Sequence, residues 1–351
     1  MMTVRVGVIG CGYWGPNLVR NFARTEGTSL SKICDSRFER AAKVAAQYGV
    51  RSVTEDAKAV IDSPDVDLVV IATPSLTHYE LAREALAAGK HVLVMKPLAT
   101  SVAHAEELVA LAERKGVLLA VDHTFVYTGA VRKIKELVDA GQVGSIYYID
   151  SVRINLGLFQ SDVNVVWDLA PHDISIIDYL LDGREPESVS TIGARHVDSP
   201  TENIAYLSLR YGDQLLAHVH VNWLAPAKVR RMIVGGSKKM IIYDDVEPSE
   251  KILVYDKGVK ISKNGDPGEN PYQLLVEYRT GDMHAPRLDT REALALEAEQ
   301  VVQCIRKGGR PVADGQAGLR VVRVLEAAEQ SLARGEPVLL GQGGQGKGAI
   351  P

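Results

Sequence analysis

Residues 4–16 read VRVGVIGCGYWGP, an apolar run that leads directly into three spaced glycines. Such a run ending in Gly-x-Gly-x-x-Gly is typical of the first strand and phosphate turn of a dinucleotide-binding fold. Gly10 permits the tight turn, Gly12 lets a pyrophosphate approach the backbone, and Gly15 lets the next helix pack closely. The free N–H groups at the start of that helix then point at the phosphates.

An acidic residue follows at the place where such folds recognise the adenosine ribose. The helix-like segment 18–24 precedes a second apolar run, 30–34, which ends at Asp35, about 20 residues past the last glycine. A carboxylate there accepts hydrogen bonds from ribose hydroxyls and repels a 2′-phosphate. We therefore predict NAD as the cofactor, while the nearby Arg37 could pair with a 2′-phosphate and keeps NADP possible.

Length and composition narrow the class of protein. A chain of 351 residues can form two domains with separate cores. The net charge of −4 comes from mixed signs without blocks, so we expect neither nucleic acid nor a membrane as partner. Three sparse cysteines, no signal peptide and no stretch of roughly 20 apolar residues predict a reduced, cytoplasmic protein without membrane spans.

Strand and helix patterns alternate up to residue 122. The expected strands cover 4–9, 30–34, 50–53, 67–72, 91–95 and 117–121. Six strands separated by helices predict a doubly wound parallel sheet, in which ligands bind beyond the carboxyl ends of the strands. The residues expected at those ends are Asp35, Thr73, Pro74, Lys96 and Asp122.

The pattern changes to shorter strands after residue 122. Strands are expected at 145–155, 188–196, 204–211, 214–223, 229–234, 240–243 and 251–255, and helices at 169–181, 291–306 and 316–334. We predict an α/β Rossmann domain over residues 1–122 and an α+β domain over 123–340 with a large open, mainly antiparallel sheet. The second domain would bind substrate and mediate oligomerisation. A flexible Gly-rich tail is expected over 341–351.

The order of four motifs resembles a known family. The motifs are GCGYWG, ATPSLTHYELAREALAAGKHVLVMKP, VDHTFVYTGAVRKIKELVDAGQVG and WDLAPHDIS. Together they resemble the glucose-fructose oxidoreductase, inositol dehydrogenase and MocA family (Gfo/Idh/MocA) over residues 4 to about 340. The resemblance implies NAD(P)-linked oxidation or reduction of a sugar or polyol carbinol. The stretch 153–173 looks most like the branch that acts on nucleotide-linked sugars.

One position departs from the family pattern. The acidic residue that usually precedes Lys-Pro is Met95 here, whereas Lys96 is retained. No role of that acidic neighbour, such as contact with the nicotinamide ribose or tuning of the lysine, therefore carries over to this chain.

Three residues are predicted to carry the chemistry. Oxidising a secondary alcohol requires a hydride acceptor, a base for the hydroxyl proton and a group that stabilises the developing oxyanion. Lys96 can donate to the reacting oxygen, and His172 is the predicted general acid/base. Asp168, four residues earlier, could orient the imidazole, although it is also a good N-cap for the helix that follows.

The other predicted site residues line the cofactor and the substrate. The predicted cofactor contacts are Gly10, Gly12, Tyr13, Trp14, Gly15, Asp35, Ser36, Arg37, Thr73, Pro74, His78 and Lys96. The predicted substrate contacts are His123, Tyr127, Gln160, Asn164, Trp167 and His172. Buried structural roles are equally expected for His123 and Tyr127, and core packing for Trp167. No metal site is predicted, although His218 and His220 share a strand face.

These observations predict an NAD(P)-dependent oxidoreductase that acts on a nucleotide-linked sugar, for example at C3. The alternative within the class is a free-sugar or inositol dehydrogenase, and a cleft rich in Arg and Lys would favour the nucleotide-linked sugar. A rival class is a cofactor-binding sensor without turnover. The joint presence of Lys96, Asp168 and His172 argues against it. We also expect a homo-oligomer, either a dimer or a tetramer.

Overall fold

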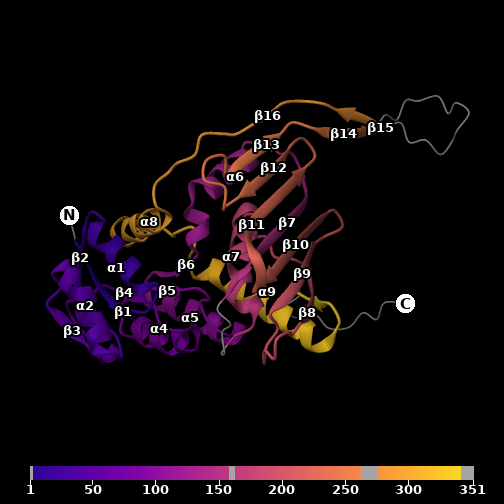
Figure 1. Cartoon of the computed structure of the whole chain (residues 1–351). Coiled ribbons are helices and arrows are strands. Elements are labelled where there is room, and N and C mark those ends of the chain that lie inside the picture. The colour runs from indigo at the N-terminus through magenta and orange to yellow at the C-terminus, as the bar shows by residue number, and fades with distance from the viewer. Residues whose placement is uncertain (1–2, 158–162, 262–275, 341–351) are drawn as a thin grey trace, which may run out of the picture.

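The computed structural model describes residues 3–157, 163–261 and 276–340. The first part of the chain forms a six-stranded parallel sheet in the order β3-β2-β1-β4-β5-β6 (Figure 1). Its strands are β1 (Val4–Ile9), β2 (Thr28–Cys34), β3 (Ser52–Thr54), β4 (Leu68–Ile71), β5 (His91–Met95) and β6 (Leu119–Asp122). The strand order reverses next to β1, which places the glycine turn at the crevice where Rossmann folds bind dinucleotides.

Helices connect these strands. They are α1 (Gly15–Arg24), α2 (Phe38–Tyr48), α3 (Ala57–Ile61), α4 (His78–Ala87), α5 (Val102–Lys115) and the 3₁₀ turn η1 (Ser75–Thr77). Strand β4 is buried along its whole length because helices cover both faces of the sheet. Gly49 ends α2 with a left-handed φ of 68°, a backbone conformation that glycine adopts without steric cost.

The second part of the chain forms a nine-stranded sheet in the order β16-β13-β12-β11-β7-β10-β9-β8-β17. Its strands are β7 (Ile146–Leu156), β8 (Ser188–Ala194), β9 (Ile204–Tyr211), β10 (Leu215–Asn222), β11 (Leu224–Gly236), β12 (Met240–Asp244), β13 (Ile252–Tyr255), β16 (Met283–His284) and β17 (Val338–Leu339). Strands β7 and β10 pair in parallel, and the other neighbours in this sheet run antiparallel. The predicted fold class is thereby confirmed. A separate pair, β14 (Gly258–Ile261) and β15 (Val276–Arg279), extends away from it (Figure 1).

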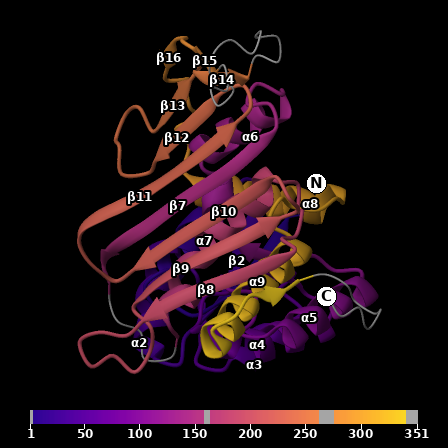
Figure 2. The same ribbon diagram turned by 90° about the vertical axis from the view of Figure 1, so that its right-hand side faces the viewer.

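One face of the large sheet is covered and the other is open. Helices α7 (Val165–Leu180) and α9 (Gly315–Arg334) pack against the covered face, and Figure 2 shows the open face toward the viewer. The alternation in β9 explains the difference, because Ala205, Leu207 and Leu209 are fully buried whereas Tyr206 on the other face is exposed.

Helix α7 begins four residues before the predicted start at residue 169. Asn164 is its N-cap and accepts hydrogen bonds from the backbone N–H groups of Val166 and Trp167, both at 3.1 Å. Asp168 is therefore a first-turn residue and not the cap. An acidic side chain there still interacts favourably with the positive end of the helix dipole.

Two later helices connect the domains. The short turn η2 (Thr124–Tyr127) and α6 (Gly129–Asp139) follow β6, and α8 (Ala293–Lys307) returns to pack against α1 and β1. Leu294, Ala298 and Val301 of α8 belong to the same buried cluster as Val6 of β1. Within the described residues, no helix is both long and apolar enough to span a membrane. The predicted tail at 341–351 lies outside the described residues.

Candidate active site

The three positions of the phosphate turn require glycine for different structural reasons. A Cβ on Gly10, whose φ is +101°, would overlap the carbonyl oxygen of Ala72, and one on Gly15 would overlap that of Gly10. A Cβ on Gly12 would meet no protein atom within 4 Å. Packing therefore explains the first and third glycines, whereas the open space at Gly12 fits a phosphate that approaches the backbone.

Asp35 lies at the mouth of this turn. Its carboxylate accepts hydrogen bonds from the backbone N–H of Cys11 at 2.7 Å and of Arg37 at 2.9 Å. These contacts place the predicted ribose acceptor next to the glycine turn. Beside it, a hollow of about 560 Å³ is lined in part by Gly12 and Tyr13.

The other predicted cofactor residues near this turn are exposed. Tyr13 and Trp14 meet edge to face with their ring centroids 5.4 Å apart, and both rings are open to solvent. Ser36 and Arg37 are exposed beyond β2, and Pro74 is exposed beyond β4. The hollow and these side chains leave room for a dinucleotide along the carboxyl ends of the strands.

His78 does not lie where sequence reasoning placed it. Its ring is fully buried, with Nδ1 2.8 Å from the carbonyl oxygen of Pro97 and Nε2 2.9 Å from that of Thr73. Since both ring nitrogens are engaged by backbone oxygens, the predicted cofactor contact is replaced by an indirect role. His78 joins the turn after β4 to the turn after β5, which carries Lys96.

Lys96 reaches across from the first domain to the first turn of α7. Its Nζ donates to the backbone carbonyl oxygen of Asp168 at 2.7 Å and lies 3.4 Å from the Oδ1 of that residue. Burial lowers the pKa of Lys96, and the Asp168 carboxylate opposes this shift. The structure thus brings together a lysine and an aspartate that are 72 residues apart.

The second oxygen of Asp168 has a partner that the sequence did not reveal. Oδ2 accepts a hydrogen bond from the indole N–H of Trp223 at 3.0 Å. Trp223 is buried beside Gly157, where a Cβ would overlap its ring. The two oxygens of Asp168 engage Lys96 and Trp223. Asp168 therefore orients the lysine, whereas the sequence had suggested that it orients His172.

His172 lies one helical turn further along α7. The residue is half-buried, with its Nδ1 enclosed and without a hydrogen-bond partner in the described part of the chain. Its ring meets Phe125 edge-on at a centroid distance of 5.0 Å. Burial, followed by the positive charges of Lys96 and Arg153, lowers the pKa of His172 well below its ordinary value. The imidazole is therefore neutral near pH 7 and can accept a proton.

His123 lies near Lys96 and His172. Burial and the charge of Lys96 lower the pKa of His123 to about 3. Both of its ring nitrogens are buried, and no described residue forms a hydrogen bond with them. His123 also contributes to the low pKa of His172. His123 is buried, and its predicted contact with substrate stays a prediction.

Two arginines of the large sheet lie near these residues, and Arg153 was not foreseen as a site residue. Arg153 of β7 is buried, with its Nε 2.6 Å from Oδ2 of Asp173 and its Cζ 4.3 Å from the centroid of the Phe125 ring. Arg230 of β11 lies opposite Arg153 in the strand register, and its Cζ is 5.9 Å from the same ring. Asp173 directly follows His172 in the sequence.

Three of the predicted substrate contacts are structural. Asn164 caps α7, and Trp167 is buried in the core with its Nε1–H donating to Glu329 at 3.1 Å. The Tyr127 hydroxyl donates to Gln300 at 3.0 Å and packs against α8. These internal bonds give each side chain a structural role, and its predicted contact with substrate stays a prediction. Gln160 lies outside the described residues.

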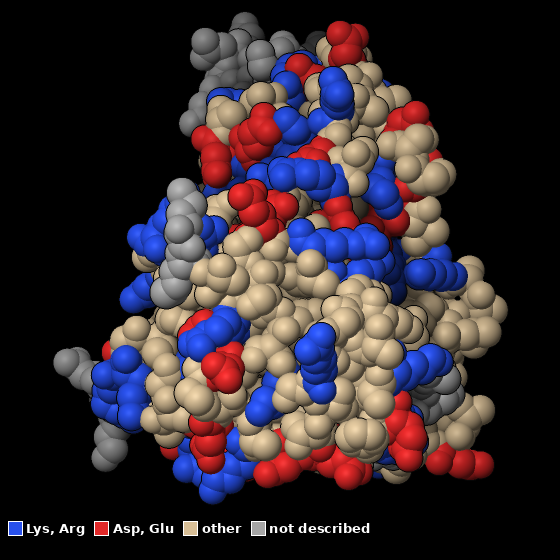
Figure 3. Space-filling model, turned by 90° about the vertical axis from the view of Figure 1, so that its left-hand side faces the viewer, with Lys and Arg blue, Asp and Glu red and all other residues tan. Residues whose placement is uncertain are grey.

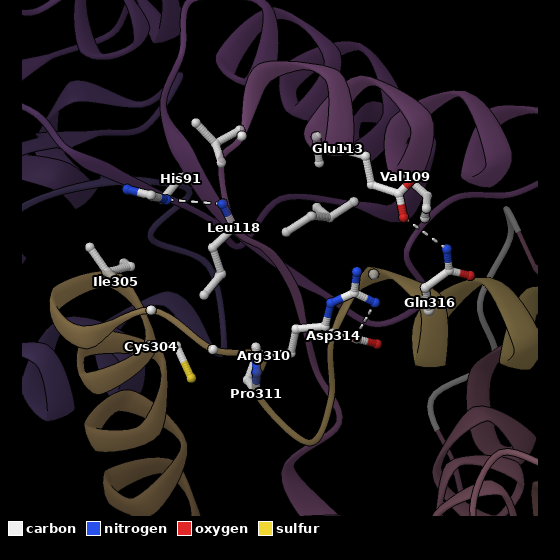
Figure 4. Close-up of a pocket in the computed structure, with 17 residues that line it drawn as sticks. His91, Val109, Glu113, Leu118, Cys304, Ile305, Arg310, Pro311, Asp314 and Gln316 are labelled. Carbon is white, nitrogen blue, oxygen red and sulfur yellow. Dashed lines mark hydrogen bonds and ion pairs between the residues drawn. The ribbon is translucent and has the colours of Figure 1, made fainter.

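A separate cavity lies far from these residues. It has a volume of about 370 Å³ and lies at the amino ends of β5 and β6, where His91 and Leu118 line it (Figure 4). Lys96 follows the opposite end of β5. Polar residues that line the cavity also pair with one another: Gln316 donates a hydrogen bond to Glu113 at 3.2 Å. None of the predicted site residues lines this cavity.

No group of three metal-binding side chains lies close together in the described ranges. His220 stacks on Tyr206 at a centroid distance of 4.3 Å on the open face of the sheet, and His218 lies near the same ring at 6.0 Å. Aromatic contacts therefore account for the two histidines of β10.

We compared the chain with models of known protein families. Residues 4–123 match the model described as "Oxidoreductase family, NAD-binding Rossmann fold", and residues 131–242 match "GFO/IDH/MocA C-terminal domain". The chain belongs to the Gfo/Idh/MocA family. It is thus an NAD(P)-dependent dehydrogenase that acts on CH–OH groups, and its first domain binds NAD(P).

Several Gfo/Idh/MocA relatives are similar along most of the chain. UDP-N-acetylglucosamine 3-dehydrogenase from Acidithiobacillus ferrooxidans is 29% identical over 92% of this chain and 95% of its own. Inositol 2-dehydrogenase 3 from Saccharopolyspora erythraea is 35% identical over 67% and 72%. The NADP⁺-dependent scyllo-inositol 2-dehydrogenase IolW from Bacillus subtilis is 25% identical over 96% of each chain.

A solved structure of the first of these relatives, GnnA from Acidithiobacillus ferrooxidans, has the same fold. It superimposes with a TM-score of 0.78 at 27% identity and covers 95% of this chain and 99% of its own. Both domains are therefore arranged as in a Gfo/Idh/MocA dehydrogenase.

The low pKa of His123 predicts how the stability of this family member depends on pH. Between about pH 6.5 and pH 3 the unfolded chain binds a proton at His123 that the folded chain does not. The free energy of unfolding should therefore fall as the pH is lowered through this window, by about 1.4 kcal/mol per pH unit for this group. His172 and His78 add to the slope in the same direction.

Denaturant unfolding between about pH 5 and pH 6.5 measures this slope. His123→Gln should make it shallower by close to one proton. An unchanged slope in His123→Gln would show that His123 binds a proton in the folded chain.

Proposed function

We propose that this dehydrogenase moves a hydride between nicotinamide and a secondary carbinol or ketone carbon of a nucleotide-linked sugar, for example at C3. The observation that carries the proposal is the arrangement around α7. Lys96 from the first domain, His172 from the helix, and a pair of arginines from the large sheet lie around one place. The lysine and the histidine suit the reacting oxygen of such a substrate, and the arginines suit its phosphates.

The roles follow from the charge state of each group. When bound, the nicotinamide ring takes up or returns the hydride. In the direction of oxidation, neutral His172 accepts the proton of the hydroxyl. The ammonium of Lys96 donates a hydrogen bond to the same oxygen and stabilises its developing negative charge. Asp168 and Trp223 hold the lysine in place from the other side. In reduction, the protons move in the opposite direction.

The arginine pair supports a negatively charged substrate. The Nη1 of Arg153 and the Nε of Arg230 are buried without an acceptor among the described residues. Buried donors normally have a partner, and a phosphate or carboxylate oxygen would supply one. Lys and Arg side chains also gather across the middle of the face that Figure 3 shows. The name of the UDP-N-acetylglucosamine relative favours the same class of substrate.

A substrate panel tests the proposal. Reduced nicotinamide is followed by absorbance while the protein is offered nucleotide sugars, free sugars and inositols with NAD and with NADP. We expect the highest kcat/KM with a nucleotide sugar. Preference for a free sugar or an inositol would favour the alternative that the inositol relatives suggest. Tight NADH binding without turnover of any compound would favour a sensor.

We further propose NAD as the preferred cofactor, because the Asp35 carboxylate lies where it would repel a 2′-phosphate. Asp35→Asn keeps an acceptor oxygen and removes the charge. The ratio of kcat/KM with NADP to that with NAD should rise about tenfold, equivalent to about 1.4 kcal/mol. Steady-state kinetics with both cofactors measures the ratio, and Asp62→Asn on the surface of the same domain is the matched control. A wild-type preference for NADP would contradict the proposal.

We also propose that the chain forms a homodimer or homotetramer through the open face of the large sheet. Ile192, Tyr206 and Leu216 are exposed on neighbouring strands of that face. Large apolar side chains exposed on a sheet face are found at protein–protein interfaces. Light scattering at micromolar concentration should give at least twice the mass of one chain, and Leu216→Glu should lower it. A wild-type mass equal to one chain would contradict this proposal.

A further inference from the structure

Two buried carboxyl groups meet beside the proposed catalytic lysine. Asp122 is the last residue of β6 and is 2% exposed, and Glu297 of α8 is 1% exposed. Helix α8 packs against η2, which begins two residues after Asp122, and after burial the Asp122 carboxylate is the next cause that raises the pKa of Glu297. Neither Glu297 oxygen has a hydrogen-bond partner among the described residues. Two ionised carboxylates cannot share such a site, so one of them must carry a proton.

The hydrogen bonds indicate which carboxyl is protonated. Asp122 already accepts hydrogen bonds from the backbone N–H of Thr124 at 3.1 Å and from the Thr124 hydroxyl. Burial raises the pKa of Asp122, while these bonds, the Glu297 side chain and the nearby Lys96 oppose that shift. Glu297 has no such donors, and burial next to Asp122 raises the pKa of Glu297 well above its ordinary value. Glu297 is therefore the proton donor of the pair.

The strand register places this pair next to Lys96. Met95 and Asp122 are paired residues in the parallel β5–β6 ladder, and Lys96 directly follows Met95. Residue 95 is the position at which the family usually has an acid. In this chain Asp122, on the neighbouring strand, lies opposite that position instead.

We propose that Asp122, held ionised by a protonated Glu297, is a positioning residue that supplies the negative charge beside Lys96. The inference rests on the proposed role of Lys96 in catalysis. A carboxylate on the β6 side balances the buried ammonium, while Asp168 balances it from α7. The lysine then stays protonated and can donate to the reacting oxygen.

Other groups around Lys96 bear on its titration. The charged groups that face it are Asp168 of α7, Arg153 of β7 and Asp122 of β6. Its own charge lowers the pKa of His78, His123 and His172, so these three are its titratable neighbours. Substituting Asp122 removes one of these negative charges and leaves both contacts of Lys96 with Asp168 in place.

Two measurements that do not depend on activity test the pair. Infrared spectra in D₂O at neutral pH should contain the carbonyl band of a protonated carboxylic acid, and Glu297→Gln should remove it. Glu113→Gln, on the surface of α5, is the control and should leave the band in place. Absence of the band from the wild-type protein would overturn the inference.

Competitive acylation followed by mass spectrometry reports the pKa of Lys96 itself. Asp122→Asn should lower that pKa, which raises the reactive fraction at a given pH. Adding Met95→Glu to Asp122→Asn returns a carboxylate from position 95 and should reverse the shift. An unchanged pKa in a folded Asp122→Asn protein, or no reversal in the double variant, would overturn the proposal. If Asp122→Asn does not fold, the infrared result decides.

The kinetic result separates this inference from the proposed function. With an active substrate, Asp122→Asn should move the basic limb of the kcat/KM profile to lower pH, and Met95→Glu should move it back. If no sugar or inositol is turned over while the infrared and labelling results hold, the proposed function fails and the charge pairing stands. If turnover is normal and the labelling shift is absent, only the pairing fails.

Discussion

Replacing His172 with asparagine is expected to lower turnover by roughly a hundredfold to ten-thousandfold, the range for the loss of one general acid/base. The reason is the neutral state of its imidazole, which burial and the charges of Lys96 and Arg153 maintain. Asparagine keeps a polar group of similar reach and cannot accept the proton. The measurement is kcat with the best substrate of the panel, alongside NADH binding by fluorescence.

Dinucleotide binding should stay the same in this variant, since His172 belongs to α7 and not to the Rossmann domain. His104→Asn on α5 is the matched control and should keep wild-type turnover. A loss smaller than about tenfold in a protein that still binds NADH would remove His172 from the mechanism. The reaction would then need another proton acceptor, and His123 would be the nearest candidate.

Replacing Lys96 with methionine should cost roughly a hundredfold to a thousandfold in kcat, as expected for the loss of one oxyanion donor. Methionine has a similar length and no charge, so the change removes the ammonium while filling its volume. The protein should remain folded, because burial already disfavours the charged form of Lys96. Thermal unfolding and circular dichroism check this point.

The effect should appear in kcat more than in KM, because the hydrogen bond to the oxygen strengthens as negative charge develops. Lys115→Met, at the exposed end of α5, is the control with the same chemical change. If Lys96→Met retained about a third or more of wild-type turnover, stabilisation of the oxyanion would have to come from elsewhere.

The first domain was predictable because its signals are local. The glycine turn, the buried run of β4 and the acid at the end of β2 lie within short stretches of sequence. Each depends on neighbours along the chain or on the period of a strand. The structure confirms the parallel sheet and places Asp35 beside the turn.

The site was less predictable because it depends on distant contacts. Trp223 meets Asp168 from 55 residues away, and Arg153 meets the helix residue Asp173 through sheet packing. Nothing in the local sequence distinguishes these side chains from ordinary core or surface residues. His78 followed the family motif and was interpreted as a cofactor contact, whereas its burial between two turns became evident only in three dimensions.

Some elements were too short or too remote to foresee. Strands β16 and β17 have two residues each, which is below what periodicity can reveal. The return of α8 to the first domain also has no local signal, since its apolar face fits either domain. Glu297 reaches Asp122 only because of that return.

The central claim is that a lysine from one domain and a histidine from the other act on the same oxygen. A crystal structure with dinucleotide and the best substrate of the panel tests it most directly. We predict that Lys96 Nζ and a ring nitrogen of His172 both lie within about 3.2 Å of one substrate oxygen, whose carbon faces the reactive ring carbon. Lys96 and His172 on opposite walls, bound to different groups, would contradict the account.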